Sequence, residues 1–141
     1  MEQVEASRPV IISPELDKAV REVCEQYGLT PDIVYAVAWT ESRFVADADN
    51  GLCYGLMQLN RQYADTFCDG AQIENIYDPA SNIKAGCWWL SELLKWANGN
   101  ENLALMAYNL GQHNAKIKWE NGVHTTRYTE MVQRARLNYS T

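Results

Sequence analysis

The chain has 141 residues, of which 47% are hydrophobic and 21% charged, and this size and composition are typical of one folded domain with one core. Its 12 basic and 18 acidic residues give a formal net charge of -6, which argues against the basic surface that DNA or RNA binding requires. No apolar run is long enough to span a membrane, so we expect neither a nucleic-acid partner nor membrane insertion.

The N-terminal part of the chain has no apolar stretch of the length that a signal peptide needs. We expect residues 1–12 to form a tail or extension, followed by a single domain over residues 13–141. Ser13, followed by a proline and a glutamate, is typical of a helix N-terminus. Gly28 is typical of a helix end, so a first helix is expected over residues 13–27.

Thr30 begins a second segment with a similar start signal, and the residues after it are apolar on nearly every face, which predicts a buried helix. The polar loop over residues 47–51 ends this segment. Further helices are expected at 56–67, from Asp78-Pro79 onward, from Asn100 to Gly111, near 115–120 and over about 126–137. No strand of useful length shows period-two alternation. The sequence therefore predicts an all-α domain of about seven helices.

Four cysteines are present, namely Cys24, Cys53, Cys68 and Cys87. They lack the Cys-x-x-Cys spacing of zinc sites, and the chain has only two histidines, so we expect no metal ion and no other cofactor. The cysteines can pair in three ways, of which Cys53 with Cys68 closes the shortest loop. They can also remain free buried thiols, which is the interpretation that we prefer.

Glu41 is the most informative single residue. It ends the second predicted helix, and Val34, Val37 and Ala38 precede it on the same face. A carboxyl group over such an apolar surface loses solvation, which raises its pKa, and a carboxylic acid that stays protonated near neutrality suits general acid catalysis of glycoside cleavage. The alternative is an ordinary acid in solvent at a helix end, paired with Arg43.

Four short motifs occur in order along the chain: Glu41-Ser42-Arg43-Phe44, Gly55-Leu56-Met57-Gln58, Asn82-Ile83-x-x-Gly86 and Ala107-Tyr108-Asn109-x-Gly111. Together they resemble the lytic transglycosylase domain of the soluble lytic transglycosylase and goose-type lysozyme-like superfamily. The resemblance extends from about Leu16 to Arg136. It implies a compact lysozyme-like helical domain with a substrate cleft, and an enzyme that degrades peptidoglycan.

The resemblance also implies roles for individual residues. Glu41 would be the catalytic acid and later the base. The implied substrate-binding residues are Ser42, Met57, Gln58, Tyr108, Asn109 and Tyr128. The amides among them also make chemical sense without the family, because an N-acetylated sugar needs amide-type hydrogen-bond partners. The alternatives are core packing for Met57 and local backbone hydrogen bonds for Gln58 and Asn109.

Two departures from the family bear on the mechanism. His124 and Thr125 stand where the family often has a Glu-Thr pair before its late tyrosine, and Asn60 stands where goose-type lysozymes have Asp. An inverting hydrolase needs two carboxyl groups with a water between them, whereas a lytic transglycosylase needs one. We therefore expect cleavage of the β-1,4 bond between N-acetylmuramic acid and N-acetylglucosamine, with a 1,6-anhydro-N-acetylmuramic acid product.

Asp47 and Asp49 keep a hydrolytic alternative open, because either could act as the base of a goose-type muramidase. Both are also ordinary turn formers, which is the interpretation that we favour. A further alternative is a catalytically inert wall-binding module of a phage tail or a secretion apparatus. The five tryptophans could stack on sugars, but Trp88 and Trp89 cannot share one helix face, so at least one is expected in the core.

The expected partner is the peptidoglycan glycan strand, bound by a monomer. Synthesis without a signal peptide would leave the chain in the cytoplasm. The chain would then reach the wall, in the periplasm or outside the cell, after holin-type release, as a phage endolysin does, or with the help of a signal that has been trimmed.

Overall fold

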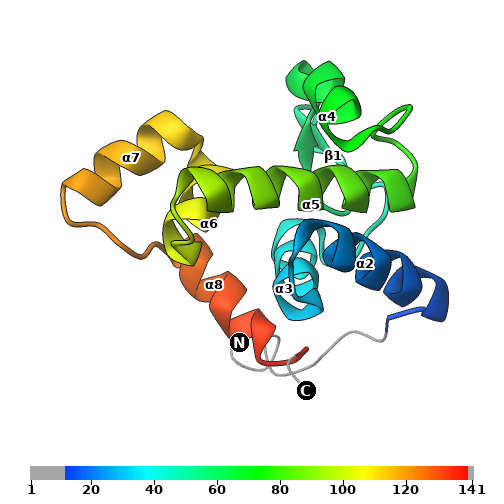
Figure 1. The fold of residues 1–141 in the computed structure, drawn as a ribbon, viewed down its shortest axis with the longest axis horizontal. Helices are drawn as coiled ribbons and strands as arrows, with labels where there is room; N and C mark the ends of the chain where they lie inside the picture. Colours follow the sequence, from blue (N-terminus) through cyan, green and yellow to red (C-terminus); the bar gives the residue numbers. More distant parts are fainter. Residues whose placement is uncertain (1–11, 140–141) are drawn as a thin grey trace.

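The computed structural model describes residues 12–139 and is mostly helical (Figure 1). Its α-helices are α2 (Pro14–Tyr27), α3 (Pro31–Ser42), α4 (Ala64–Ala71), α5 (Pro79–Trp96), α6 (Glu101–Leu110), α7 (Gln112–Glu120) and α8 (Arg127–Arg136). The seven α-helices of this described part confirm the predicted all-α class. The expected tail over residues 1–12 lies, except for Ile12, outside the described residues.

The predicted helix starts at Ser13 and Asp78 are formed as the sequence indicates. The backbone N–H of Leu16 donates to the Ser13 hydroxyl at 3.2 Å, and Gly28 ends α2 with a φ of 70°. Asp78 caps α5 in the same way, since its carboxylate accepts from the backbone N–H of Ser81 at 3.1 Å. Capping satisfies backbone donors that a helix leaves unpaired at its first turn.

The predicted third helix over residues 56–67 is wrong over residues 56–63. The strand β2 (Leu59–Asn60) pairs antiparallel with β1 (Cys53–Tyr54), the short 3-10 helix η1 (Arg61–Tyr63) follows, and an α-helix begins only with α4. The physical reason is backbone conformation, because Gly55 and Gln58 have φ values of 89° and 49° and so cannot belong to a right-handed helix.

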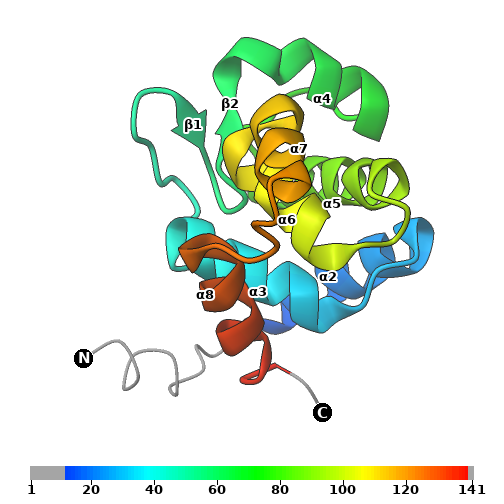
Figure 2. The same ribbon diagram turned by 90° about the vertical axis from the view of Figure 1, so that its left-hand side faces the viewer.

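The core forms where α5 packs against α2, α4 and α6, while α8 packs along α3 (Figures 1 and 2). The prediction of a buried second helix is confirmed, since six consecutive α3 residues, 33–38, are at most 4% exposed. The end of α3 therefore emerges from the core beside α8. Among residues 12–139, no helix is both long and apolar enough to cross a membrane.

All four cysteines are free thiols, so the alternative pairing of Cys53 with Cys68 does not form. Cys24 and Cys87 are buried, and Cys53 and Cys68 are half-buried. Within residues 12–139, no group of three or more His, Cys, Asp or Glu side chains is arranged to hold a metal ion.

Candidate active site

Glu41 lies in the last turn of α3, where its carboxyl group meets the first turn of α8. The Tyr128 hydroxyl donates a hydrogen bond of 2.6 Å to Oε2 of Glu41. Burial raises the pKa of Glu41 to about 7, and the Tyr128 hydrogen bond acts in the opposite direction because it favours the carboxylate. A pKa in this range leaves a large share of the carboxyl groups protonated near neutral pH.

The start of α8 fixes the position of Tyr128. The Thr126 hydroxyl accepts from the backbone N–H of Thr129 at 3.2 Å, and the Thr129 hydroxyl accepts from that of Thr126 at 2.9 Å. This reciprocal capping orders the first turn of α8. Burial raises the pKa of Tyr128 well above its ordinary value, and the charge of Glu41 contributes to the same rise. Tyr128 therefore stays protonated as a donor to Glu41.

The turn over residues 55–58, called the central turn below, joins two of the other motifs. The Ser42 hydroxyl donates to the carbonyl of Leu56 at 2.8 Å. The Tyr108 hydroxyl donates to the carbonyl of Met57 at 2.7 Å. Both hydroxyls were expected to meet substrate, but in this structure they link the central turn to α3 and α6.

Helix α5 holds the other side of the central turn through Asn82, which is 1% exposed. Its side-chain oxygen accepts from the backbone N–H of Met57 at 2.8 Å, and its side-chain nitrogen donates to the carbonyls of Tyr54 at 3.0 Å and Ile76 at 2.9 Å. Gly55 approaches so closely that a Cβ atom there would lie 2.2 Å from this nitrogen. All four motifs therefore converge on the central turn.

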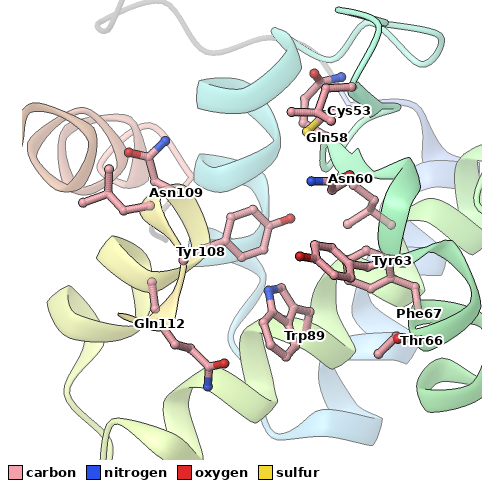
Figure 3. Close-up of a pocket in the computed structure, with 15 residues that line it drawn as sticks. Cys53, Gln58, Asn60, Tyr63, Thr66, Phe67, Trp89, Tyr108, Asn109 and Gln112 are labelled. Carbon is pink, nitrogen blue, oxygen red and sulfur yellow. The ribbon is translucent and has the colours of Figure 1, made fainter. Parts of the chain in front are cut away.

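A pocket of about 570 Å³ opens between the central turn and α4 on one side and the junction of α6 with α7 on the other (Figure 3). It is lined by Leu52, Cys53, Gln58, Leu59, Asn60, Tyr63, Thr66, Phe67, Trp89, Ala107, Tyr108, Asn109, Leu110, Gly111 and Gln112. None of these side chains is charged. Burial raises the pKa of two of them, Tyr108 and Cys53, and the charge of Glu41 raises both pKa values further. The pocket therefore lies close to the Glu41 carboxyl.

The structure brings only some of the expected substrate-binding residues to this pocket. Gln58, Tyr108 and Asn109 line it, and Tyr128 lies on Glu41. Ser42 is buried under the central turn, and Met57 is fully buried against Gly86, so neither side chain lines the pocket. Ser42 lies inside because its hydroxyl donates to a backbone carbonyl, and Met57 lies inside because its side chain packs in the core.

Gln58 combines the two interpretations that the sequence allowed. Its side-chain nitrogen donates to the carbonyls of Ala48 at 2.9 Å and Gly55 at 3.0 Å, which supports its left-handed backbone conformation. Because this amide nitrogen is used within the turn, the part of Gln58 that remains for a ligand is its carbonyl oxygen.

Asp47 and Asp49, the possible second carboxylates, are both exposed and neither lines the pocket. Arg61 binds the Asp49 carboxylate through two hydrogen bonds of 2.7 and 2.8 Å, and the Arg61 guanidinium lies 5.2 Å from the ring centre of Tyr54. The Arg61 hydrogen bond lowers the pKa of Asp49 to about 2. A carboxylate held in this way braces the loop before β1 and is a weak proton acceptor.

Several pocket residues were not singled out from the sequence, among them Trp89, Tyr63, Thr66 and Gln112. Tryptophan was recognised as a residue type that can stack on sugars, but the sequence did not show which of the five faces a cleft. That assignment depends on where α4 and α6 cross α5, which are contacts between segments far apart in the chain.

Several known proteins are similar to this chain in sequence. Residues 18–132 match the model of the transglycosylase SLT domain. The chain is 29% identical over 106 residues to the peptidoglycan transglycosylase gp16 of Escherichia phage T7, covering 72% of this chain and 8% of that protein. It is 33% identical over 93 residues to the X polypeptide of Escherichia coli, covering 60% of this chain and 54% of that protein.

Two solved structures share the fold. The inactive glutamate-to-glutamine mutant of lytic transglycosylase Slt from Pseudomonas aeruginosa superimposes with a TM-score of 0.72 at 25% identity, and covers 87% of this chain and 23% of that one. The 70 kDa soluble lytic transglycosylase of Escherichia coli gives a TM-score of 0.77 at 16% identity, with coverages of 87% and 24%. The chain thus spans from under a tenth to about half of the lengths of these proteins. The family that the four motifs resemble is confirmed: the chain belongs to the transglycosylase SLT domain family.

Proposed function

We propose that this domain is a peptidoglycan lytic transglycosylase in which Glu41 transfers the proton. The observation that supports this role most strongly is the half-buried Glu41 carboxyl, whose pKa of about 7 keeps it partly protonated while Tyr128 holds it at 2.6 Å. General acid catalysis is most effective when the pKa of the acid lies near the working pH.

The proposed reaction uses Glu41 twice. As an acid, Glu41 gives its proton to the oxygen that bridges N-acetylmuramic acid and N-acetylglucosamine, and the bond from C1 of the muramyl sugar to that oxygen breaks. The resulting Glu41 carboxylate then takes the proton of the muramyl C6 hydroxyl, whose oxygen forms a bond to C1. The products are an N-acetylglucosamine end with a free 4-hydroxyl and a 1,6-anhydromuramyl end, and no water is consumed.

The surroundings of Glu41 support transglycosylation over hydrolysis. A hydrolase of the inverting type requires a second carboxylate as the base for water. No charged side chain lines the described pocket, and Asp49 is bound by Arg61. The substrate proposed here lies outside the cytoplasmic membrane, so we propose that the domain acts in the periplasm or outside the cell.

Product analysis separates transglycosylation from hydrolysis. Purified peptidoglycan is digested with the protein, and the released fragments are analysed by mass spectrometry. We expect 1,6-anhydromuramyl ends, which are lighter by one water than the reducing ends that a muramidase leaves. Reducing muramyl ends without anhydro products would instead establish the hydrolytic alternative.

A Glu41→Gln variant tests the role of the acid. Because proton transfer contributes on the order of 10²- to 10⁴-fold to the rate, the variant should lose at least about 10²-fold in activity while keeping its circular dichroism spectrum. Glu120→Gln, on the exposed surface of α7, is the matched control and should retain full activity. Undiminished wall lysis by Glu41→Gln would remove this residue from the reaction.

A further inference from the structure

We propose that Trp89 contacts the substrate, and that the uncharged pocket around it binds an N-acetylglucosamine ring and not the muramyl residue with its stem peptide. This inference rests on the proposed function, because it assigns one part of the same glycan strand to one part of the site.

Trp89 is anchored on one side and open on the other. Its ring lies 6.3 Å from that of Phe67, nearly edge-on at 81°, and 5.9 Å from that of Trp88. The indole nitrogen is directed toward the space beside Tyr108 (Figure 3). A ring that is already fixed by packing loses little conformational entropy when a ligand binds to it.

The indole N–H of Trp89 is available to a ligand. Among residues 12–139, no side chain or backbone carbonyl accepts a hydrogen bond from it, and it is not among the fully buried unpaired polar atoms. A tryptophan N–H in a partly buried position usually has a hydrogen-bond partner. A sugar hydroxyl or the carbonyl of an N-acetyl group in the pocket would supply that missing acceptor.

The chemistry of the pocket walls selects an uncharged ligand. Aromatic and aliphatic surfaces alternate with the amides of Asn60, Asn109 and Gln112 and with the hydroxyl of Thr66. Such walls match a sugar ring with hydroxyl and acetamido groups. A carboxylate placed there would lose solvation without meeting an opposite charge, and so would an ammonium group once Glu41 is replaced by glutamine. The lactyl-linked stem peptide of a muramyl residue would have to lie outside the pocket, so an N-acetylglucosamine ring, which has no charged substituent, suits these walls better.

The test measures binding of two probes, the N-acetylglucosamine trimer and the glucosamine trimer, by calorimetry. The protein carries Glu41→Gln so that no turnover occurs. We expect the acetylated trimer to bind about tenfold more tightly than the deacetylated one, whose ammonium groups the pocket cannot pair. Equal binding of the two trimers would contradict the selection of an uncharged ligand.

Trp89→Phe in the same background keeps an aromatic ring but removes the N–H, and should weaken binding of the acetylated trimer by about tenfold. Trp96→Phe, on the same helix, is the matched control, since Trp96 does not line the pocket and the rings packed against Trp89 are those of Phe67 and Trp88. It should bind the acetylated trimer with unchanged affinity. Unchanged affinity in Trp89→Phe would overturn the inference.

A second measurement does not depend on how the tryptophan variants fold. The indole N–H signal of Trp89 in a nitrogen-15 spectrum of the Glu41→Gln protein should shift when the acetylated trimer is added, while that of Trp96, which does not line the pocket, should stay in place. A Trp89 signal that does not move at saturating trimer would refute the contact.

The proposed function and this inference can fail independently of each other. Trimer binding that depends on Trp89 without any wall cleavage refutes only the enzymatic function, and cleavage with Trp89-independent binding refutes only this inference.

Discussion

The Glu41 carboxyl experiences two opposing influences, and their balance sets its protonation. Burial beside α8 disfavours the charged form, whereas the Tyr128 hydroxyl at 2.6 Å stabilises it. Tyr128 also fixes the direction in which the carboxyl group points. Through this hydrogen bond Tyr128 acts as a positioning residue for the proposed acid.

Tyr128→Phe should move the pH dependence of the reaction. Without the hydrogen bond the pKa of Glu41 rises above about 7. Because the reaction needs the protonated acid, kcat/KM falls as pH rises through this pKa, and the fall should occur at higher pH in the variant, by about one unit for a hydrogen bond of ordinary strength. The measurement is a pH profile of wall-fragment cleavage by both proteins.

The control for this profile is Tyr77→Phe, since Tyr77 is exposed and packs against Tyr54, away from Glu41. It should leave the profile in place. If Tyr128 served only the packing of α8, its variant would lose activity equally at all pH values, and the alkaline limb would not move.

At the scale of elements, the central turn explains why the sequence motifs were informative although several of their residues do not touch the pocket. Ser42, Asn82 and Tyr108 each donate or accept one hydrogen bond at this turn. The family resemblance therefore reports a shared scaffold that holds the Glu41 helix, the pocket wall and α5 together.

Gly86→Ala tests this scaffold. The expected change in the free energy of unfolding has the opposite sign to the change that helix propensity alone predicts. Alanine normally stabilises a helix interior relative to glycine by roughly 1 kcal/mol. Here a Cβ at Gly86 would lie 2.6 Å from Cβ of Met57, so α5 or the central turn has to shift. We expect a loss of about 1–3 kcal/mol in the free energy of unfolding, measured with urea.

Lys95→Ala, at an exposed position of the same helix, is the control and should change the free energy of unfolding by less than about 0.5 kcal/mol. A Gly86→Ala protein as stable as the original, or more stable, would show that Met57 is not packed as tightly as described.

Helices with clear start signals could be predicted from the sequence, whereas the segment between Gly55 and Ala64 could not. Ser13 and Asp78 cap their helices through local hydrogen bonds, which sequence order alone determines. The apolar spacing of Leu56 and Leu59 suggested a helix, but their burial results from a turn held by the distant Asn82. Contacts between remote segments decided this part of the fold.

The site shows the same division. Glu41 was singled out because Val34, Val37 and Ala38 lie on its own helix, whereas its hydrogen-bond partner Tyr128 comes from the distant α8. The side chains of Met57 and Ser42 were assigned to the substrate from the resemblance. They point inward because Met57 packs against Gly86 and the Ser42 hydroxyl donates to the carbonyl of Leu56. Trp89 could not be selected from the sequence, since its exposure to the pocket depends on α4 and α6.

At the scale of the whole molecule, Glu41 should make stability depend on pH. Its pKa rises from 4.5 to about 7 on folding, so the native state binds a proton more tightly than the unfolded chain. The contribution of Glu41 to the free energy of unfolding should therefore be highest below about pH 4.5. It should decrease by on the order of 3 kcal/mol as pH rises to about 7.

Urea unfolding of the original protein and of Glu41→Gln, at about pH 5 and about pH 8, measures this contribution. The variant lacks the titrating group, so its stability relative to the original should increase between the two pH values. An equal difference at both would mean that folding does not perturb the acid.

The central claim is that the Glu41 carboxyl stays partly protonated near neutral pH, and a carbon-13 NMR titration of the side-chain carboxyl groups tests it most directly. The Glu41 signal is identified by its absence from the spectrum of Glu41→Gln. The account predicts a titration midpoint near 7, well above the ordinary glutamate value of 4.5. A midpoint close to 4.5 would contradict it, because Glu41 would then be an ordinary carboxylate at neutral pH.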